Sequence, residues 1–306
     1  MAVITNRAAS ALARLRNRAK LGGISYQHCL QLFMQEEFLR RLSLSPYKRH
    51  LVLKGGLFIY SLTRFQSRPT IDVDFLMKGL PNGEAQVKAM VEGIIATDSG
   101  NDFVTFSMGK IKPIALEKQY PGLGIQIIGH ILNVRVPFGI DLGVGDVITP
   151  AACERDVYAM LPDYTPPRLL TYSLESSIAE KLDAMLRRLE LNSRMKDFYD
   201  VYYLSRHFPF DGNTLAKALQ DTMDNRHTPC DDALFSRLAS LEPHGGMLRK
   251  WENFMHTLHH DTLPFGEVMH DISRLLAPVV HAVAHGEEFP RQWQPDKGWS
   301  DTQRDS

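Results

Sequence analysis

The segment Leu-Pro-Asp-Tyr-Thr-Pro-Pro at residues 161–167 most constrains the fold, because it separates two parts of the chain with different patterning. Proline lacks an N–H donor and ends regular elements, so three prolines in seven residues predict a linker or a rigid crossing. Before this segment, strand-like alternation is interleaved with helical patterns, whereas the apolar patterns after it have helical spacing. We therefore predict an α+β fold, in which a mixed sheet with flanking helices is followed by a helical C-terminal domain.

The expected organisation has three regions: an α/β domain with N-terminal helices at 1–162, a helical domain at 163–285 and a polar tail at 286–306. The tail has tryptophan, proline and charge without periodicity, and we expect its end to be disordered. Helices are expected over 8–20, 26–42, 57–63, 82–97, 174–191, 197–205, 212–222, 231–241, 249–257 and 265–284. Strands are expected over 50–53 and 71–77, and residues 102–142 are strand-rich.

Charge, cysteine content and the lack of long apolar runs argue against a disulfide-rich, secreted or membrane-spanning protein. The 306 residues contain 35 basic and 35 acidic side chains, so net charge gives no evidence for a polyanionic partner. Cys29, Cys153 and Cys230 are far apart and odd in number, which predicts reduced thiols in the cytoplasm. No apolar run approaches the ~20 residues of a membrane span, and the N-terminus has no signal-peptide pattern. We expect a cytoplasmic protein without a membrane partner.

Two aspartates of one predicted strand, Asp72 and Asp74, are the first candidates for chemistry. Strand side chains alternate faces, so both carboxylates point to one side and Ile71, Val73 and Phe75 to the other. Two carboxylates this close repel each other unless a positive charge lies between them, and a hard divalent cation is the usual solution. The plainer alternative is the polar face of an exposed edge strand.

A glycine pair precedes this strand. Residues 51–53 predict a strand that ends at Lys54, and Gly55 and Gly56 then open a helix. Backbone N–H groups at such a turn favour phosphate oxygens, glycine allows close approach, and Lys54 adds a point charge. Gly-Gly alone is more often a plain turn, but with a helix, a loop and Asp-x-Asp after it the pattern predicts a phosphate cradle beside a metal site. Phosphoryl and nucleotidyl transfer need both, because positioning and charge neutralisation dominate that chemistry.

A third carboxylate follows the cleanest strand alternation in the chain. The residues of one parity are Leu132, Val134, Val136, Phe138, Ile140 and Leu142. Asp141 lies on the opposite face with a glycine two residues away on either side, and Pro137 predicts an edge, a bulge or a break. With Asp72 and Asp74, Asp141 would complete a triad for one or two Mg²⁺ ions, or it would deprotonate an attacking hydroxyl. The alternative is an ordinary solvent-facing aspartate at a strand end.

The order of these motifs resembles the nucleotidyltransferase superfamily, and more narrowly the AbiEii toxin family of bacterial abortive-infection and toxin–antitoxin systems, which includes the mycobacterial MenT toxins. The motifs are Lys54-Gly-Gly, Asp72-Val-Asp-Phe, Ile178-Ala-Glu-Lys-Leu-Asp-Ala-Met and Arg194-Met-Lys-Asp-Phe-Tyr-Asp-Val-Tyr-Tyr-Leu. The superfamily usually has Gly-Ser where this chain has Gly-Gly, which removes a hydroxyl contact to phosphate. The likeness spans about residues 51–204, and four short motifs in this order are specific.

The resemblance implies a role for six residues of the chain. Asp72 and Asp74 would be metal ligands, Gly55 and Gly56 would hold the triphosphate, Lys181 would contact phosphate, and Asp197 would be a further catalytic carboxylate. Asp141 has a weaker family precedent and rests mainly on the alternation.

The residues alone leave alternatives open in the second half. Lys181 lies beside the buried stripe of a helix, where it either reaches into a cleft or snorkels to water. Asp197 begins a predicted helix and is a candidate N-cap, and it shares a face with Asp200. Glu180 and Asp183 are expected to form ordinary solvated pairs. A local basic cluster predicts either an RNA-binding patch or a solvated helix face: Arg187, Arg188, Arg194, Lys196, Arg206 and His207.

Together these observations predict an enzyme that binds Mg²⁺ and a nucleoside triphosphate, transfers the nucleoside monophosphate to a hydroxyl and releases pyrophosphate. The resemblance implies that the acceptor is the 3′ end of tRNA, and that the protein is a growth-inhibiting toxin with a cognate antitoxin. One alternative is the same chemistry on protein or small-molecule hydroxyls. Another is a catalytically inactive binding protein that acts through protein partners.

Overall fold

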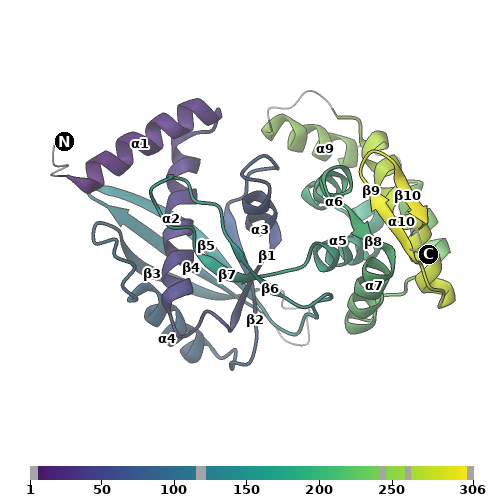
Figure 1. Cartoon of the computed structure of the whole chain (residues 1–306), viewed down its shortest axis with the longest axis horizontal. Helices are drawn as coiled ribbons and strands as arrows, with labels where there is room; N and C mark the ends of the chain where they lie inside the picture. The colour runs from purple at the N-terminus through teal and green to yellow at the C-terminus, as the bar shows by residue number, and fades with distance from the viewer. Residues whose placement is uncertain (1–5, 115–121, 242–245, 259–262, 302–306) are drawn as a thin grey trace, which may run out of the picture. The chain divides into compact units, whose positions relative to one another are not determined.

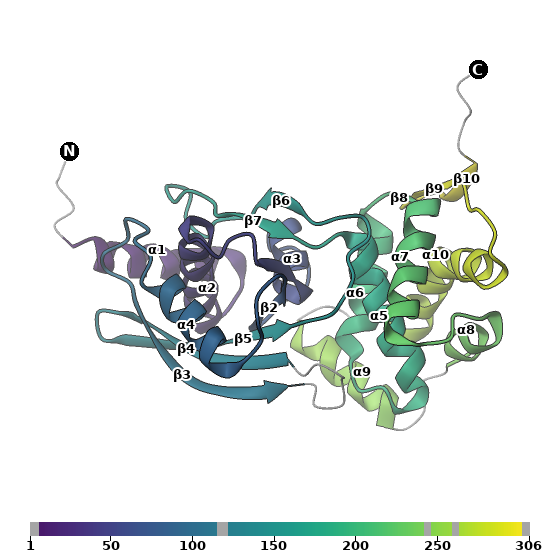
Figure 2. The ribbon, with the colours of Figure 1, turned by 90° about the horizontal axis from the view of Figure 1, so that it is seen from below.

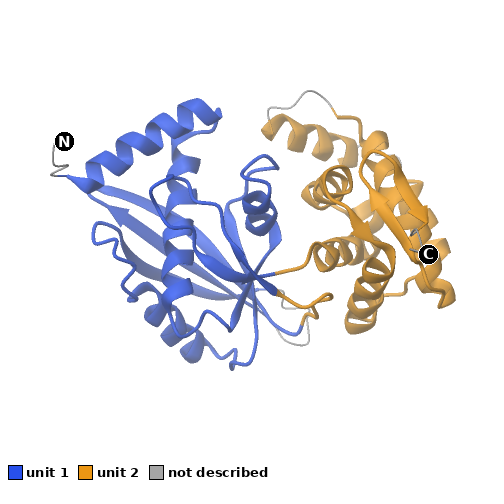
Figure 3. Cartoon of the chain, viewed as in Figure 1, with its two compact units in different colours: residues 1–145, 153–171 blue, residues 146–152, 172–306 orange. Residues whose placement is uncertain are grey.

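The structure, a computed structural model, describes residues 6–114, 122–241, 246–258 and 263–301. The chain divides into two compact units (Figure 3). Unit 1 comprises Met1–Gly145 and Cys153–Thr171, and unit 2 comprises Asp146–Ala152 and Tyr172–Ser306. Unit 1 contains a mixed sheet with helices and unit 2 is mainly helical (Figure 1), so the predicted fold class is confirmed.

Unit 1 is built on a seven-stranded sheet with the strand order β3-β4-β5-β2-β1-β7-β6. The strands are β1 (Leu51–Lys54), β2 (Asp72–Met77), β3 (Thr105–Ile114), β4 (Gly122–Ile131), β5 (Val134–Gly143), β6 (Cys153–Asp156) and β7 (Arg168–Thr171). The β2–β5 and β1–β7 pairs are parallel and the other pairs are antiparallel. Figure 2 shows β3, β4 and β5 side by side at one end of this sheet.

Pro137 lies inside β5 and neither breaks nor bulges it. Its register partner on β4 is Ile128, while pairing with β2 begins only at Gly139, two residues later. Pro137 therefore lies where β5 has a neighbour on one side only, which is a local edge that tolerates a missing N–H donor. Leu132, which the alternation assigned to the strand, precedes it and lies exposed with a φ of 51°.

The helices of unit 1 are α1 (Arg7–Gly22), α2 (Tyr26–Leu44), α3 (Gly55–Leu62) and α4 (Glu84–Ile95). In α2, Phe38 is fully buried and its ring contacts Phe75 of β2, Phe138 of β5 and Phe106 of β3. Because strand side chains alternate faces, the acidic residues of β2 and β5 point to the sheet face opposite α2.

A buried ion network lies within α2. Arg40 pairs with both Glu36 and Glu37, and the backbone N–H of Met160 donates to Glu36 Oε2 at 2.6 Å. Glu36 is only 4% exposed. Burial raises the pKa of Glu36 to about 7, although Arg40 acts in the opposite direction.

This shift predicts a pH-dependent contribution to the stability of unit 1. The Glu36 carboxyl loses its proton near pH 4.5 in the unfolded chain but near pH 7 in the fold, so its contribution is fully present below about pH 4.5 and declines up to about pH 7. We expect the unfolding free energy of the wild type, relative to Glu36→Gln, to fall by about 3 kcal/mol across this window. Urea unfolding followed by circular dichroism measures this difference in unfolding free energy at each pH, and Glu84→Gln, at an exposed position, is the control. A pH-independent difference would contradict the prediction.

Unit 2 contains the six helices that the sequence predicted, with ends that differ by a few residues. They are α5 (Leu174–Arg188), α6 (Met195–His207), α7 (Gly212–Arg226), α8 (Asp232–Ala239), α9 (Gly246–Thr257) and α10 (Phe265–His285). The predicted helix over 174–191 ends earlier than expected and continues as a 3₁₀ turn at Leu189–Leu191, because Leu189 adopts a positive φ of 41°.

The predicted tail contains regular structure. β9 (Arg291–Gln294) and β10 (Gly298–Asp301) form a hairpin that pairs with β8 (Phe210–Asp211) in a second, three-stranded sheet. Trp293 is 2% exposed, and its indole N–H donates to the carbonyl of Ser205 at 2.8 Å. The tail expected at 286–306 therefore contains regular structure at residues 291–301, which its lack of periodicity did not indicate. The end of the tail, for which disorder was expected, lies at residues 302–306, outside the described part.

The proline-rich segment 161–167 does not link the two units. It lies inside unit 1, where it connects the antiparallel strands β6 and β7. The loop closes with a hydrogen bond from Val157 N to Pro167 O at 2.8 Å, and Leu161 is 3% exposed. The structure thus differs from the boundary predicted at 162/163, because the prolines lie in the connection between two strands of one sheet.

Two further features concern the whole described chain. Cys29, Cys153 and Cys230 are free thiols, and Cys29 is buried. Among the described residues, no helix combines the length and the apolar character that crossing a membrane needs.

Candidate functional site

Five residues on five neighbouring strands form a row across the sheet of unit 1. In register, Lys54 pairs with Asp74, Asp74 with Asp141, Asp141 with Gly124, and Gly124 with Lys112. Directly paired residues place their side chains on the same face of a sheet. The row therefore presents two adjacent carboxylates in its middle and an ammonium group on either side. We call it the acid row.

The remaining predicted carboxylate, that of Asp72, lies beside this row. Asp72 is exposed, two residues before Asp74 on the same face, and its register partner is Gly139. Its Oδ1 is 3.1 Å from the position that a Cβ on Gly139 would take, and Asp141 Oδ1 is 3.1 Å from the corresponding position on Gly124. Glycine thus leaves room beside two of the three carboxylates that the sequence predicted.

These carboxylates fit a hard divalent cation. The Cβ atoms of directly paired residues lie about 4.5–5.5 Å apart, which lets Asp74 and Asp141 share one ion with ligand distances of about 2.0–2.1 Å. The predicted ligands offer oxygen only, which suits Mg²⁺ better than zinc or copper. Asp72, Asp74 and Asp141 are the residues that would hold such an ion.

The glycine turn lies against the acid row. α3 begins at Gly55, directly after β1, and Gly55 has a φ of +67°, which side chains other than glycine rarely adopt. A Cβ on Gly55 would stand 2.0 Å from Asp74 Oδ2, so the turn and the carboxylate are in direct contact. The first N–H groups of a helix favour anions, and Gly55 and Gly56 place such N–H groups next to the carboxylates.

Two residues near this turn were not singled out from the sequence. Thr70 Oγ1 lies 2.7 Å, and Arg68 Nη2 lies 3.3 Å, from the position that a Cβ on Gly56 would take. Both side chains are 8% exposed. A guanidinium beside the glycine turn adds to the positive potential there. The available signal was a basic residue shortly before the Asp-Val-Asp strand.

Substitution of Gly55 tests the contact with Asp74. Gly55→Ala is expected to displace the Asp74 carboxylate and to lower nucleotidyl transfer by about 10²-fold, the effect of roughly a 1 Å misplacement. The matched control is Gly23→Ala, because Gly23 has a φ of +64° but nothing within 4 Å of a new Cβ. Both variants carry the same backbone cost of about 1–2 kcal/mol, so only the contact differs. Equal transfer rates of the two variants would refute the role of this contact.

A groove of about 400 Å³ lies on the same face of the sheet, next to Asp141. Its lining residues are Lys110, Lys112, Ile114, Gly124, Ile125, Gln126, Pro137, Phe138, Gly139 and Asp141. Lys110 and Lys112 are exposed and two residues apart on β3, so their ammonium groups project to one side. The groove therefore places two positive charges beside the carboxylates.

Lys181 of unit 2 is held by two buried carboxylates. Its ammonium donates to Asp197 Oδ1 at 3.1 Å and to Asp200 Oδ2 at 2.6 Å. Asp197 is 0% and Asp200 1% exposed, and the Lys181 side chain is 11% exposed. Asp197 and Asp200 share a face as the spacing predicts, whereas the alternative that Lys181 snorkels to water is wrong.

Asp197 is not an N-cap. It is the third residue of α6, whose N-cap position is Arg194, and it accepts a hydrogen bond from Arg194 Nε at 2.5 Å. Burial raises the pKa of Asp197, but the ammonium of Lys181 and the guanidinium of Arg194 lower it more, to about 2. The Asp197 side chain is therefore ionised at neutral pH.

Glu180 and Asp183 belong to a buried ion network and not to solvated pairs, so that prediction is wrong. Asp183 is 3% exposed and accepts from Arg226 at 3.0 Å, while Arg226 also pairs with Glu180 and Asp146. Arg226 lies on α7 and Asp183 on α5, and no local pattern in the sequence indicates that these two side chains pair.

The predicted basic cluster is largely engaged within unit 2. Arg187 pairs with Asp183, Arg194 with Asp197, and Arg206 with Asp271. These contacts favour a set of structural ion pairs over an open patch that follows an RNA backbone.

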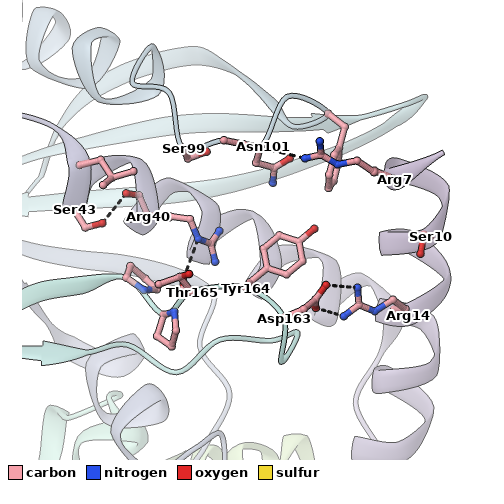
Figure 4. A pocket seen from close by; sticks show the side chains of 15 residues that line it. Arg7, Ser10, Arg14, Arg40, Ser43, Ser99, Asn101, Asp163, Tyr164 and Thr165 are labelled. Atoms are coloured by element: carbon pink, nitrogen blue, oxygen red, sulfur yellow. Dashed lines mark hydrogen bonds and ion pairs between the residues drawn. The ribbon is translucent and has the colours of Figure 1, made fainter. Parts of the chain in front are cut away.

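A second hollow of unit 1, of about 530 Å³, is lined by α1, α2 and two loops (Figure 4). Its arginines already have partners: Arg14 pairs with Asp163, and Arg40 donates to the carbonyl of Thr165 at 3.2 Å. The lining includes none of the residues predicted for the site. We therefore assign the candidate site to the acid row and the glycine turn.

Comparison with known proteins gives one family, and solved structures with a similar fold include two from Helicobacter pylori. Residues 37–277 match the family described as Nucleotidyl transferase AbiEii toxin, Type IV TA system. A candidate nucleotidyltransferase from H. pylori and JHP933 from Helicobacter pylori each show 15% identity and a TM-score of 0.45. The match covers 86% of this chain in both cases, with 98% of the first protein and 95% of the second. No curated protein matches the chain significantly.

Proposed function

The chain belongs to the AbiEii family of nucleotidyltransferase toxins, and we propose that it transfers a nucleoside monophosphate from Mg²⁺-bound NTP to the 3′ end of tRNA. The family match covers residues 37–277 and includes both the acid row and the Lys181 cluster. The family is that of type IV toxin–antitoxin systems, which implies an antitoxin as a partner.

The observation that carries the proposal is the acid row beside the glycine turn. Asp74 and Asp141 are register partners, and Asp74 Oδ2 lies against Gly55. Nucleotidyl transfer needs a metal held by carboxylates next to a cradle for phosphate oxygens, and the acid row beside the glycine turn supports the proposal that this site binds both.

Each part of the site has a task in this reaction. The acceptor oxygen forms a bond to the α-phosphorus, the bond from that phosphorus to the bridging oxygen breaks, and pyrophosphate leaves with the electron pair. Asp141, which lines the groove, would accept the proton of the acceptor hydroxyl. The N–H groups of Gly55 and Gly56, with Arg68 nearby, hold the triphosphate. Mg²⁺, when bound, neutralises phosphate charge.

The family resemblance adds two residues of unit 2 to the proposal. Lys181 and Asp197 are proposed to contribute to transfer. Substitution of Lys181 and Asp197 tests this role, with nucleotidyl transfer and the stability of unit 2 measured separately.

The proposal is tested by incubation with Mg²⁺, labelled NTPs and total tRNA. We expect label at the 3′ end of the tRNA. Oxidation of the 3′-terminal hydroxyls with periodate before the incubation should prevent this labelling. Label on protein instead of RNA would reject tRNA as the acceptor. Absence of any transfer, with all four NTPs, would reject the enzyme as proposed.

The groove beside Asp141 supports a polyanionic acceptor. We expect Lys110→Ala/Lys112→Ala to weaken tRNA binding by about tenfold. The slope of log K against the logarithm of the salt concentration should become less steep by about 1.4, because each lost phosphate contact of a single strand contributes ~0.7. NTP binding should not change. Lys88→Ala on α4 is the control, since Lys88 is an exposed lysine outside the groove. If the double variant keeps the salt dependence of the wild type, RNA does not use this groove.

A further inference from the structure

A cluster on unit 2 combines two histidines and an aspartate outside the acid row. His281 and His285 lie one turn apart near the C-terminal end of α10, so their rings share a face, and Asp232 is the first residue of α8. The Nδ1 atoms of His281 and His285 are 2.9 Å and 3.8 Å from Asp232 Oδ2. One ligand atom from each residue lies within 4.8 Å of the other two.

We propose that Asp232, His281 and His285 form a second metal site, which binds a divalent transition-metal ion such as Zn²⁺ and joins α8 to α10. The ligand atoms of a tetrahedral ion at about 2.0–2.1 Å lie about 3.3 Å apart, and one ligand atom from each of these three residues already lies within 4.8 Å of the others. Small shifts of exposed side chains complete the geometry, because these side chains are 47–55% exposed. A water molecule supplies the fourth ligand.

The chemistry of the donors selects the class of ion. Imidazole nitrogen suits zinc, nickel and copper, whereas Mg²⁺ requires oxygen ligands, so this site and the acid row take different metals. Nδ1 of His285 donates to the carbonyl of His281 at 2.9 Å, since a carbonyl oxygen only accepts. That bond leaves Nε2 of His285 with its lone pair, which is the form that a metal ligand needs.

The surrounding charges also favour a cation. The C-terminal end of a helix carries a partial negative charge, and His281 and His285 lie in the last two turns of α10. Asp232 adds a full negative charge on the facing helix. The cluster therefore attracts a cation even at a pH at which the imidazoles are neutral.

The full-length protein, saturated with Mg²⁺, is titrated with ZnCl₂ by isothermal calorimetry. We expect the wild type and His270→Ala, an exposed histidine of the same helix, to bind one more equivalent than His281→Gln/His285→Gln. Asp232→Asn should bind that equivalent at least tenfold more weakly. All three tryptophans belong to unit 2, so their fluorescence should also show a Zn²⁺-dependent rise in Tm of about 5 °C for the wild type and none for the double variant.

Two outcomes would overturn the proposal. One is the same stoichiometry and Kd in the double variant as in the wild type, and the other is a wild type that neither binds Zn²⁺ nor gains thermal stability from it. His285→Gln alone provides a second variant with a smaller change, and it is expected to lose the same equivalent. Nucleotidyl transfer is not used as a readout, so failure of the proposed function leaves this test unaffected.

Discussion

Asp74→Asn is expected to lower nucleotidyl transfer by about 10³-fold or more without loss of the fold. Asp74 is one of the two adjacent carboxylates of the acid row, where it pairs in register with Lys54 and Asp141 and contacts Gly55. Asparagine preserves the shape of the side chain and one oxygen but removes the charge. The site then loses one of the carboxylates that hold the cation, while Lys54 keeps its positive charge.

Single-turnover transfer of labelled nucleotide to tRNA measures this loss, with Mg²⁺ varied. We expect Asp74→Asn to need a higher Mg²⁺ concentration for its residual activity, and Asp141→Asn to lose activity as well. Asp156→Asn is the matched control, because Asp156 is an exposed aspartate on β6 in the same unit. Circular dichroism and thermal unfolding exclude misfolding. Wild-type transfer by Asp74→Asn would remove the acid row from the reaction.

The sequence was sufficient to predict which residues of a strand share a face. The alternation in β2 and β5 placed Asp72, Asp74 and Asp141 opposite the apolar residues, and the structure has this parity. Local patterning also predicted the helices of unit 2, because helical periodicity is a property of consecutive residues. The functional roles of these residues stay predictions, which the substitutions above address.

Contacts between distant segments were not predictable in the same way. Register between strands decides that Gly124 and Lys112 extend the row beyond Asp141, and no local pattern encodes that pairing. Arg226 is far from Asp183 in sequence but neutralises it in the fold. The same reason explains the hairpin at residues 291–301, whose short strands become regular only by pairing with β8.

Lys181→Met is expected to destabilise unit 2 by about 3–5 kcal/mol, because it leaves Asp200 and Asp197 buried without their shared ammonium. Arg194 still pairs with Asp197, so the larger part of the loss arises at Asp200. Lys217→Met is the matched control, since Lys217 pairs with Asp221 on the surface, where such a pair is worth about 0–1 kcal/mol. Tryptophan fluorescence during urea unfolding reports unit 2 alone, because unit 1 has no tryptophan.

The pH dependence separates loss of charge pairing from loss of packing. In the wild type, Asp197 has its pKa lowered from 3.8 to about 2, so its contribution is present above pH 3.8 and is lost as the pH falls toward 2. In Lys181→Met, Asp197 loses the ammonium whose charge does most to lower its pKa, so the deficit relative to the wild type should shrink as the pH falls from 7 toward 4. A deficit that is constant with pH would show that Lys181 acts by packing only.

Neutralising the carboxylates then distinguishes a structural lysine from one that also contacts phosphate. Lys181→Met combined with Asp197→Asn and Asp200→Asn removes the three buried charges together. Most of the lost stability should return, because the guanidinium of Arg194, which loses its contact with a carboxylate, is 46% exposed and stays hydrated. If Lys181 only stabilises unit 2, nucleotidyl transfer returns with the fold. If Lys181 or Asp197 takes part in transfer, as the family resemblance implies, the variant regains stability but stays inactive, and we expect this second result.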